Sequence, residues 1–173
     1  MNEQTNRQQV LKAVLHYFYQ DNTQSGAHCK YNLKYHIVWC PKYRRSFLVG
    51  KLATRLGEIF YEIARDYGFK IIAYEVMPDH IHLLVEVPPK YSPAQIVQYF
   101  KGISSRLMRQ EFLEEIKRYI WKDGTLWARG YYIASVADSA TTEVIREYIN
   151  SQKATGTEPQ KVSESDYHQP NLL

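Results

Sequence analysis

Between Tyr31 and Gln152 the sequence switches repeatedly between two hydrophobic periods, and this switching limits the possible folds more than any other feature. Alternating apolar and polar residues predict strands, whereas apolar residues at every third or fourth position predict helices. The expected elements are a strand at 31–40, a helix around 52–63, strands at 69–77 and 80–87, a helix from 93, a strand at 131–136 and a helix at 141–152.

This order, β-α-β-β-α-β-α, begins with the split βαβ pattern of ferredoxin-like folds. It predicts an α+β domain with a central antiparallel sheet, helices on one face of the sheet, an open second face, and an additional C-terminal helix. The strand at 80–87 should lie at the sheet centre. Its residues Ile81, Leu83 and Val85 should face the helices, because alternate residues of a strand point to the same side.

Local signals support the expected element ends. Pro41 ends the first strand, and Gly68 stands where a helix C-terminal cap belongs. Ser92, Pro93 and Gln95 have the spacing of an N-terminal cap, a first-turn proline and a capping box. These signals favour two well-defined helices packed against the sheet.

The rest of the chain and its composition suggest one core domain with two appendages. Residues 1–28 are an N-terminal extension of unknown role, 29–153 the core domain, and 154–173 a flexible tail. The two cysteines, Cys29 and Cys40, fit a reducing compartment. The polar N-terminus is no signal peptide, and no apolar run is long enough for a membrane span. We therefore expect a cytoplasmic protein, and its net charge of +4 is compatible with nucleic acid.

The segment MPDHIHLLVEV places His80 and His82 two residues apart on one strand, so both side chains point to the same face. Two imidazoles at that spacing can bind one cation. The alternative is a pair of half-exposed histidines without a joint role. His36, on the polar face of the first strand, is a candidate neighbour of the pair.

In the last helix, Tyr148 and Gln152 are four residues apart and therefore lie on one face. A glutamine carbonyl one turn beyond a tyrosine offers a neutral oxygen ligand next to a possible phenolic nucleophile. Alternatively, Tyr148 is a core residue and Gln152 is solvated.

Basic residues cluster after the first strand and along the second core helix. Such charges often form only a solvated face, but aromatic neighbours such as Tyr43 and Tyr99 favour nucleic acid, because bases stack on aromatic rings. The candidate DNA-binding residues are Lys42, Arg44, Arg45, Lys101, Ser105 and Arg106.

Together these segments resemble the single-tyrosine HUH transposases, the TnpA type of small insertion sequences that move as single-stranded DNA. The HUH element is His80-Ile81-His82, and the resemblance covers about Tyr31 to Gln152. The blocks that carry it, in the family's order, are YHIVWCPKYRR, MPDHIHLLVEVPP, IVQYFKGISSRLMR, LWARGYYIASV and YINSQ.

The resemblance implies a DNA transposase that cleaves and transfers single strands, with 29–153 as its catalytic domain. Tyr148 would be the nucleophile that forms a 5′-phosphotyrosine bond. His80, His82 and Gln152 would bind a divalent metal ion, Mg²⁺ or Mn²⁺. The partners would be single-stranded DNA with hairpin ends and a second subunit, in a homodimer whose active sites are shared between subunits. No nucleotide cofactor is expected, and the setting would be the nucleoid of a bacterial or archaeal cell.

Two other functions stay open on the sequence alone. One is a domesticated HUH nuclease that processes genomic palindromes, although YINSQ lacks the ending typical of that group. The other is a non-catalytic module that binds single-stranded nucleic acid, because RNA-recognition domains share this fold. The chain also departs from the family at Ala137-Asp138, where a glycine is common, and residues 1–28 have no clear counterpart.

Overall fold

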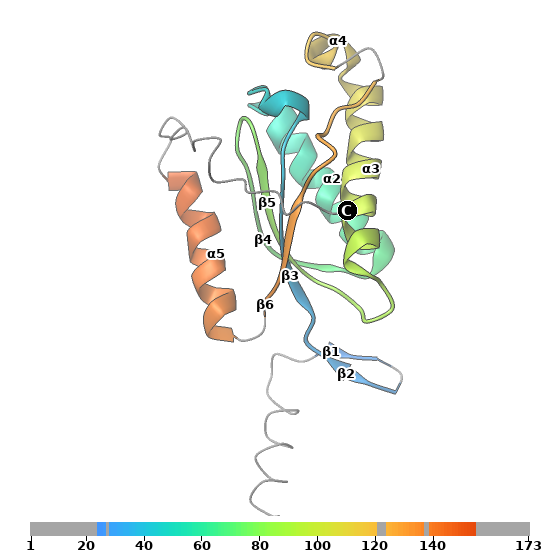
Figure 1. Cartoon of the computed structure of the whole chain (residues 1–173), viewed down its shortest axis with the longest axis vertical. Coiled ribbons are helices and arrows are strands. Elements are labelled where there is room, and N and C mark those ends of the chain that lie inside the picture. The colour runs from blue at the N-terminus through green and yellow to red at the C-terminus, as the bar shows by residue number, and fades with distance from the viewer. Residues whose placement is uncertain (1–23, 27, 121–123, 137–138, 155–173) are drawn as a thin grey trace, which may run out of the picture.

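A computed structural model describes residues 24–26, 28–120, 124–136 and 139–154 (Figure 1). Most of the extension, the departure at 137–138 and the tail at 155–173 lie outside these residues. No helix in the described ranges has the length and apolar content of a membrane span. The elements are β1 (Gln24–Ser25), β2 (Lys30–Tyr31), β3 (Lys34–Trp39), η1 (Lys42–Arg44), α2 (Lys51–Tyr67), β4 (Lys70–Val76), β5 (Ile81–Glu86), α3 (Pro93–Glu111), α4 (Leu113–Ile116), β6 (Tyr132–Val136) and α5 (Ser139–Ala154).

The main sheet has the strand order β4-β5-β3-β6, and all its neighbouring strands are antiparallel. The predicted central position of β5 is therefore confirmed. In this register His82 lies opposite Val38 on one side and opposite Glu75 on the other. The α+β class and the order of the main elements agree with the sequence prediction.

Helices α2 and α3 cover one face of the sheet and enclose the main hydrophobic core (Figure 1). Ile81, Leu83 and Val85 of β5 are fully buried there, as the alternation predicts. The capping box of Ser92 and Gln95 opens α3. Gly68 ends α2 in the left-handed conformation that glycine adopts without steric penalty.

The second face of the sheet is not open, and this corrects the sequence prediction. Helix α5 lies across it, on the side opposite α2 and α3 (Figure 1). Ile149 is fully buried in a small second cluster with Ala73, Leu84 and Val136. Leu84 explains the difference: β5 carries an apolar residue between His82 and Glu86, and burying it together with Ile149 is favourable.

The predicted strand at 31–40 is also interrupted. Its first part, β2, pairs with β1 in a separate two-stranded sheet, and β3 begins at Lys34. The pairing joins the end of the N-terminal extension to the start of the core domain. The short elements η1 and α4 were not predicted either, because three or four residues carry too little periodicity.

Replacing Ile149 by alanine should loosen α5 from the sheet. Removing a buried isoleucine side chain usually costs about 2–5 kcal/mol, and the cluster beneath α5 is small, so we expect opening of this helix to become easier by that order. Amide hydrogen exchange of α5 measures it. Val144→Ala is the matched control, because Val144 is 66% exposed on the same helix. Unchanged exchange in the Ile149→Ala protein would contradict the described packing.

Candidate active site

Two histidines meet where β5 begins. His80 directly precedes the strand and His82 is its second residue. Their ring centroids are 5.0 Å apart, with the ring planes at 78°. His82 is buried, whereas His80 is partly exposed. The sequence alternation thus predicted their proximity correctly, but not the burial of His82, which follows from the covered second face.

Tyr148 brings a phenol to this pair from α5. Its ring lies edge-on to His82, with centroids 5.7 Å apart and planes at 84°. The side chain is 49% exposed, so it is not a core residue. The next residue, Ile149, is buried against the sheet and thereby fixes which side of α5 faces the histidines. His82 and Tyr148 meet within one chain, while the expected sharing of sites between subunits stays a prediction.

Gln152 lies in α5 one turn beyond Tyr148, as predicted, but its side chain is outside the described part of the structure. In the described residues no three His, Cys, Asp or Glu side chains are grouped to hold a metal ion. The histidine pair therefore supplies two candidate ligands, and a third would have to be of another kind, such as an amide oxygen.

His36 on β3 completes a row of three histidines. Its Nε2 lies 3.1 Å from Nδ1 of His82, and the two rings stack with centroids 5.3 Å apart. Burial, followed by the nearby His80 and His36, lowers the pKa of His82 to about 4, and burial also lowers the pKa of His36. His82 is therefore neutral at pH 7, so one of its two ring nitrogens has a lone pair without a proton.

Asp79 and Arg44 stand behind His80, and the sequence analysis assigned neither to this place. Asp79 is buried, and its Oδ1 lies 2.6 Å from Nδ1 of His80. Its other oxygen accepts a hydrogen bond of 2.9 Å from Nε of Arg44. Arg44 and Tyr43 have positive φ angles of 53° and 60°, an uncommon backbone for residues other than glycine. The carboxylate directly before His80 was the available sequence signal.

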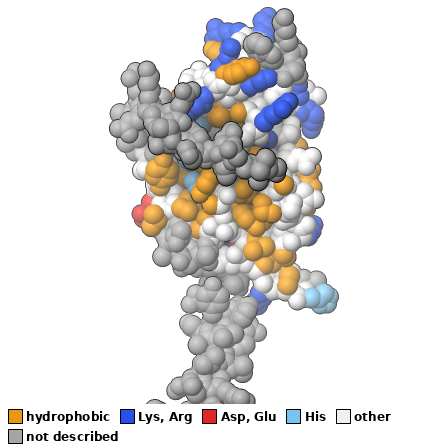
Figure 2. Space-filling model, viewed as in Figure 1, with side chains coloured by type: hydrophobic (Ala, Val, Ile, Leu, Met, Phe, Trp, Pro, Cys, Tyr) orange, Lys and Arg blue, Asp and Glu red, His pale blue; other side chains and the backbone are white. Residues whose placement is uncertain are grey.

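The candidate DNA-binding residues fall into two groups. Lys42, Arg44 and Arg45 belong to the η1 segment. Arg45 donates to the carbonyl of Arg118, next to α4, so this segment and α4 lie at the same end of the molecule. Figure 2 shows Lys and Arg side chains gathered at that end. Both Arg44 and Arg45 thus have internal partners as well as exposed surface.

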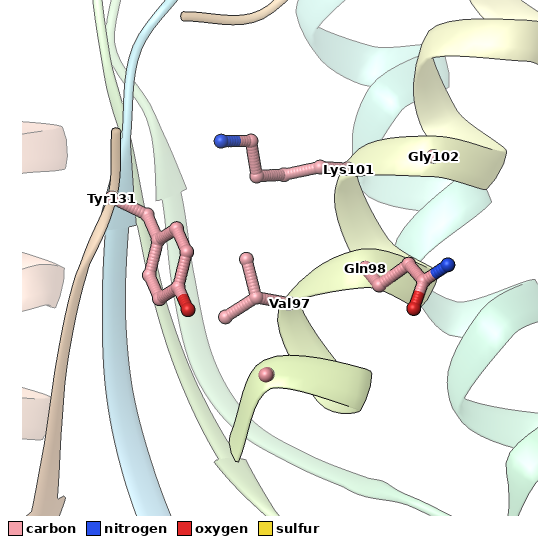
Figure 3. Close-up of a pocket in the computed structure, with 6 residues that line it drawn as sticks. Val97, Gln98, Lys101, Gly102 and Tyr131 are labelled. Atoms are coloured by element: carbon pink, nitrogen blue, oxygen red, sulfur yellow. The ribbon is translucent and has the colours of Figure 1, made fainter. Parts of the chain in front are cut away.

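The second group lies on α3 and is less available. Nζ of Lys101 donates to the carbonyls of Ala128, Arg129 and Gly130 at 2.8–3.1 Å, and burial lowers the pKa of this ammonium. Figure 3 shows its side chain beside Tyr131. Both residues line a shallow pocket with a volume of about 270 Å³. Lys101 therefore holds residues 128–130, which lead into β6, against α3. Ser105 is half-buried, and exposed Arg106 donates to Gln110 at 3.3 Å.

Comparison with known proteins matches most of this domain. The family described as "Transposase IS200 like" matches residues 29–152. The ISDra2 transposase TnpA of Deinococcus radiodurans is 39% identical over 122 residues, which are 70% of this chain and 85% of that protein. The transposase for insertion sequence element IS200 of Salmonella typhimurium is 36% identical over 129 residues, 75% of this chain and 82% of that protein.

Two solved structures are also similar. A Deinococcus radiodurans protein described as a transposase has a TM-score of 0.59 and 33% identity, covering 75% of this chain and 97% of that one. A REP-associated tyrosine transposase bound to a REP hairpin has a TM-score of 0.55 and covers 76% and 74% of the two chains. Its identity is only 16%, so this second likeness concerns the fold alone.

Buried His82 predicts how stability depends on pH. The pKa of His82 is lowered from 6.5 in the unfolded chain to about 4 in the fold. The contribution of neutral His82 to the free energy of unfolding is therefore complete above pH 6.5. It is lost as pH falls towards 4, because the unfolded chain then binds more protons than the folded chain. Urea unfolding without metal at pH 7.5 and 4.5 measures this loss. We expect His82→Gln to lose less stability than wild type over this interval, and an equal loss would contradict a buried neutral His82.

Proposed function

The chain belongs to the IS200-like transposases, and we propose that it cleaves and rejoins single-stranded DNA at insertion-sequence ends through a covalent bond to Tyr148. The observation that carries this proposal is the position of the Tyr148 ring, edge-on to His82 and half exposed. A phenol beside two imidazoles, on a surface that DNA can reach, has the parts of a phosphoryl-transfer site.

In the proposed reaction the Tyr148 oxygen attacks a phosphodiester phosphorus. The new bond joins this oxygen to phosphorus, the bond from phosphorus to the 3′ oxygen breaks, and a 5′-phosphotyrosine and a free 3′-hydroxyl result. The phenolic proton is lost, and the leaving 3′ oxygen gains one. A 3′-hydroxyl later reverses the exchange and rejoins the DNA. Because the link to protein conserves the bond energy, no nucleotide cofactor is needed.

The donor set fits a divalent metal ion. His80 and His82 would bind it through imidazole nitrogens, and Gln152 is proposed as the amide ligand. When bound by these residues, such an ion would polarise the phosphoryl oxygen and offset the charge that develops there. All three side chains are neutral ligands, so they leave the charge of the ion undiminished. Imidazoles favour softer ions than Mg²⁺, and between Mg²⁺ and Mn²⁺ the ligand chemistry favours Mn²⁺.

The proposed substrate is single-stranded DNA with hairpin ends. The protein would act on it at the bacterial or archaeal nucleoid, in the cytoplasm. The basic end with η1 and α4 supports this, because phosphates bind guanidinium and ammonium groups. The structural neighbour, a tyrosine transposase of similar fold, is described as bound to a REP hairpin, and this supports the proposed substrate. We further propose a homodimer with shared active sites, as in the resembling family.

Tyr148→Phe should abolish the covalent DNA adduct while leaving hairpin binding intact. The change keeps the ring and its contact with His82 but removes the phenolic oxygen, the atom of this side chain that would bond to phosphorus. The measurement is denaturing electrophoresis after incubation with single-stranded hairpin DNA and manganese. A parallel sample with chelator should also lack the adduct.

Tyr132→Phe is the matched control, because Tyr132 is a similarly exposed tyrosine on the edge strand near His36. It should form the adduct like wild type. An adduct on the Tyr148→Phe protein would move the nucleophile elsewhere. Shifted but intact DNA with every protein, wild type included, would favour a non-catalytic binding module. Cleavage of genomic palindromes alone would favour the domesticated nuclease.

Neutralising Lys42 and Arg45 together should weaken hairpin binding and its salt dependence. Each lost phosphate contact on a single strand lowers the slope of log affinity against log salt by about 0.7. Arg44 is left unchanged because it holds Asp79. The control is the double variant Arg65→Gln with Lys90→Gln, which removes the same charge near the other end of α2. Fluorescence anisotropy measures the hairpin affinity of both double variants. Wild-type affinity and slope in the Lys42/Arg45 double variant would show that this basic segment is only a solvated face.

A further inference from the structure

Each histidine of the pair has one ring nitrogen already engaged inside the protein. Nδ1 of His80 lies 2.6 Å from a carboxylate oxygen of Asp79. A carboxylate only accepts hydrogen bonds, so Nδ1 of His80 carries the hydrogen. In the neutral ring this leaves the lone pair on Nε2, which is the form that a metal ion requires.

His82 has a different partner, and the consequence depends on which of the two rings donates. Its Nδ1 lies 3.1 Å from Nε2 of His36, so one of these nitrogens donates and the other accepts. If His36 accepts, the hydrogen of His82 is on Nδ1, and Nε2 of His82 has a free lone pair. If His36 donates, Nε2 of His82 carries the hydrogen and cannot bind a cation.

Arg44 determines which carboxylate oxygen of Asp79 faces His80. Its Nε donates to Oδ2 at 2.9 Å, while Oδ1 faces His80. The guanidinium has no acceptor, so whatever atom faces Arg44 must accept. The positive φ angles at Tyr43 and Arg44 place the start of this side chain in a turn of unusual backbone geometry.

We infer that Arg44 with Asp79, and His36 on the other side, are positioning residues that fix His80 and His82 in the Nδ1–H tautomer, so that both Nε2 lone pairs are available before a metal ion arrives. The inference rests on the proposed metal-dependent function. It gives Arg44 a role inside the protein, while the DNA contact expected from the sequence stays a prediction. Partners of this kind usually change metal affinity by about 10–100-fold when removed.

Asp79→Asn tests the inference with little change of shape. Arg44 should hold the amide carbonyl, so the amide NH₂ faces Nδ1 of His80 and donates to it. His80 should then move to the Nε2–H tautomer, since an asparagine in place of such an aspartate can impose the wrong tautomer. Two-bond ¹⁵N–¹H spectra of the metal-free protein report the tautomer, and calorimetry reports manganese affinity, which should fall at least about 10-fold.

A second substitution separates positioning from a general structural role. In the Asp79→Asn background, Arg44→Met frees the amide to turn its carbonyl towards His80, so part of the Nδ1–H signal and of the manganese affinity should return. Arg45→Met in the same background is the matched control, because Arg45 donates to the Arg118 carbonyl and not to Asp79. It should restore neither.

His82 is tested in the same way through His36. His36→Gln offers a carbonyl near the position of Nε2 and should retain the Nδ1–H tautomer of His82. His36→Leu offers no acceptor and should lose that preference. Wild-type tautomers and affinity in both Asp79→Asn and His36→Leu would overturn the inference, as would an Nε2–H tautomer of either histidine in the wild type. Correct tautomers in a wild type that binds no manganese would support the inference and overturn the proposed function.

Discussion

The structure depends on one strand, β5, whose residues are buried on both faces. Alternation sends Ile81, Leu83 and Val85 into the main core, and it sends His82 and Leu84 to the face beneath α5. A buried imidazole needs a hydrogen-bond partner, because an unsatisfied polar group inside a protein is costly. The neighbouring strand supplies that partner with His36. The burial of β5 therefore accounts for the fixed position of His82 beside His36.

The sequence predicted the parts of this arrangement that depend on local rules. Strand alternation placed His80 beside His82, and helical spacing put Tyr148 and Gln152 one turn apart in α5. The cover over the second face was not predicted, because it depends on a small apolar cluster assembled from β4, β5, β6 and α5. The pairing of Arg44 with Asp79 was missed for a similar reason: 35 residues separate them, and only tertiary structure brings them together.

The basic residues show that some cations have partners inside the protein that charge alone does not reveal. Lys101 and Arg44 were both expected on DNA, yet Lys101 holds three backbone carbonyls and Arg44 holds a buried carboxylate. Arg109 likewise donates to the carbonyls of Ser105 and Gly124. A long cationic side chain can satisfy carbonyls that secondary structure leaves unpaired, and sequence patterns do not reveal such a role. The charge of a side chain therefore does not by itself say whether it faces solvent or holds the backbone.

The turn that contains Tyr43 and Arg44 has a consequence for which residues suit position 43 of this chain. Left-handed backbone at residues with a side chain costs roughly 1–2 kcal/mol each, so glycine at position 43 would relieve strain. Glycine would also let the turn adopt many more conformations. The backbone of Arg44 would then no longer be fixed in the position that places its guanidinium beside Asp79. Selection for a more stable chain and selection for an ordered site therefore act in opposite directions on this one position.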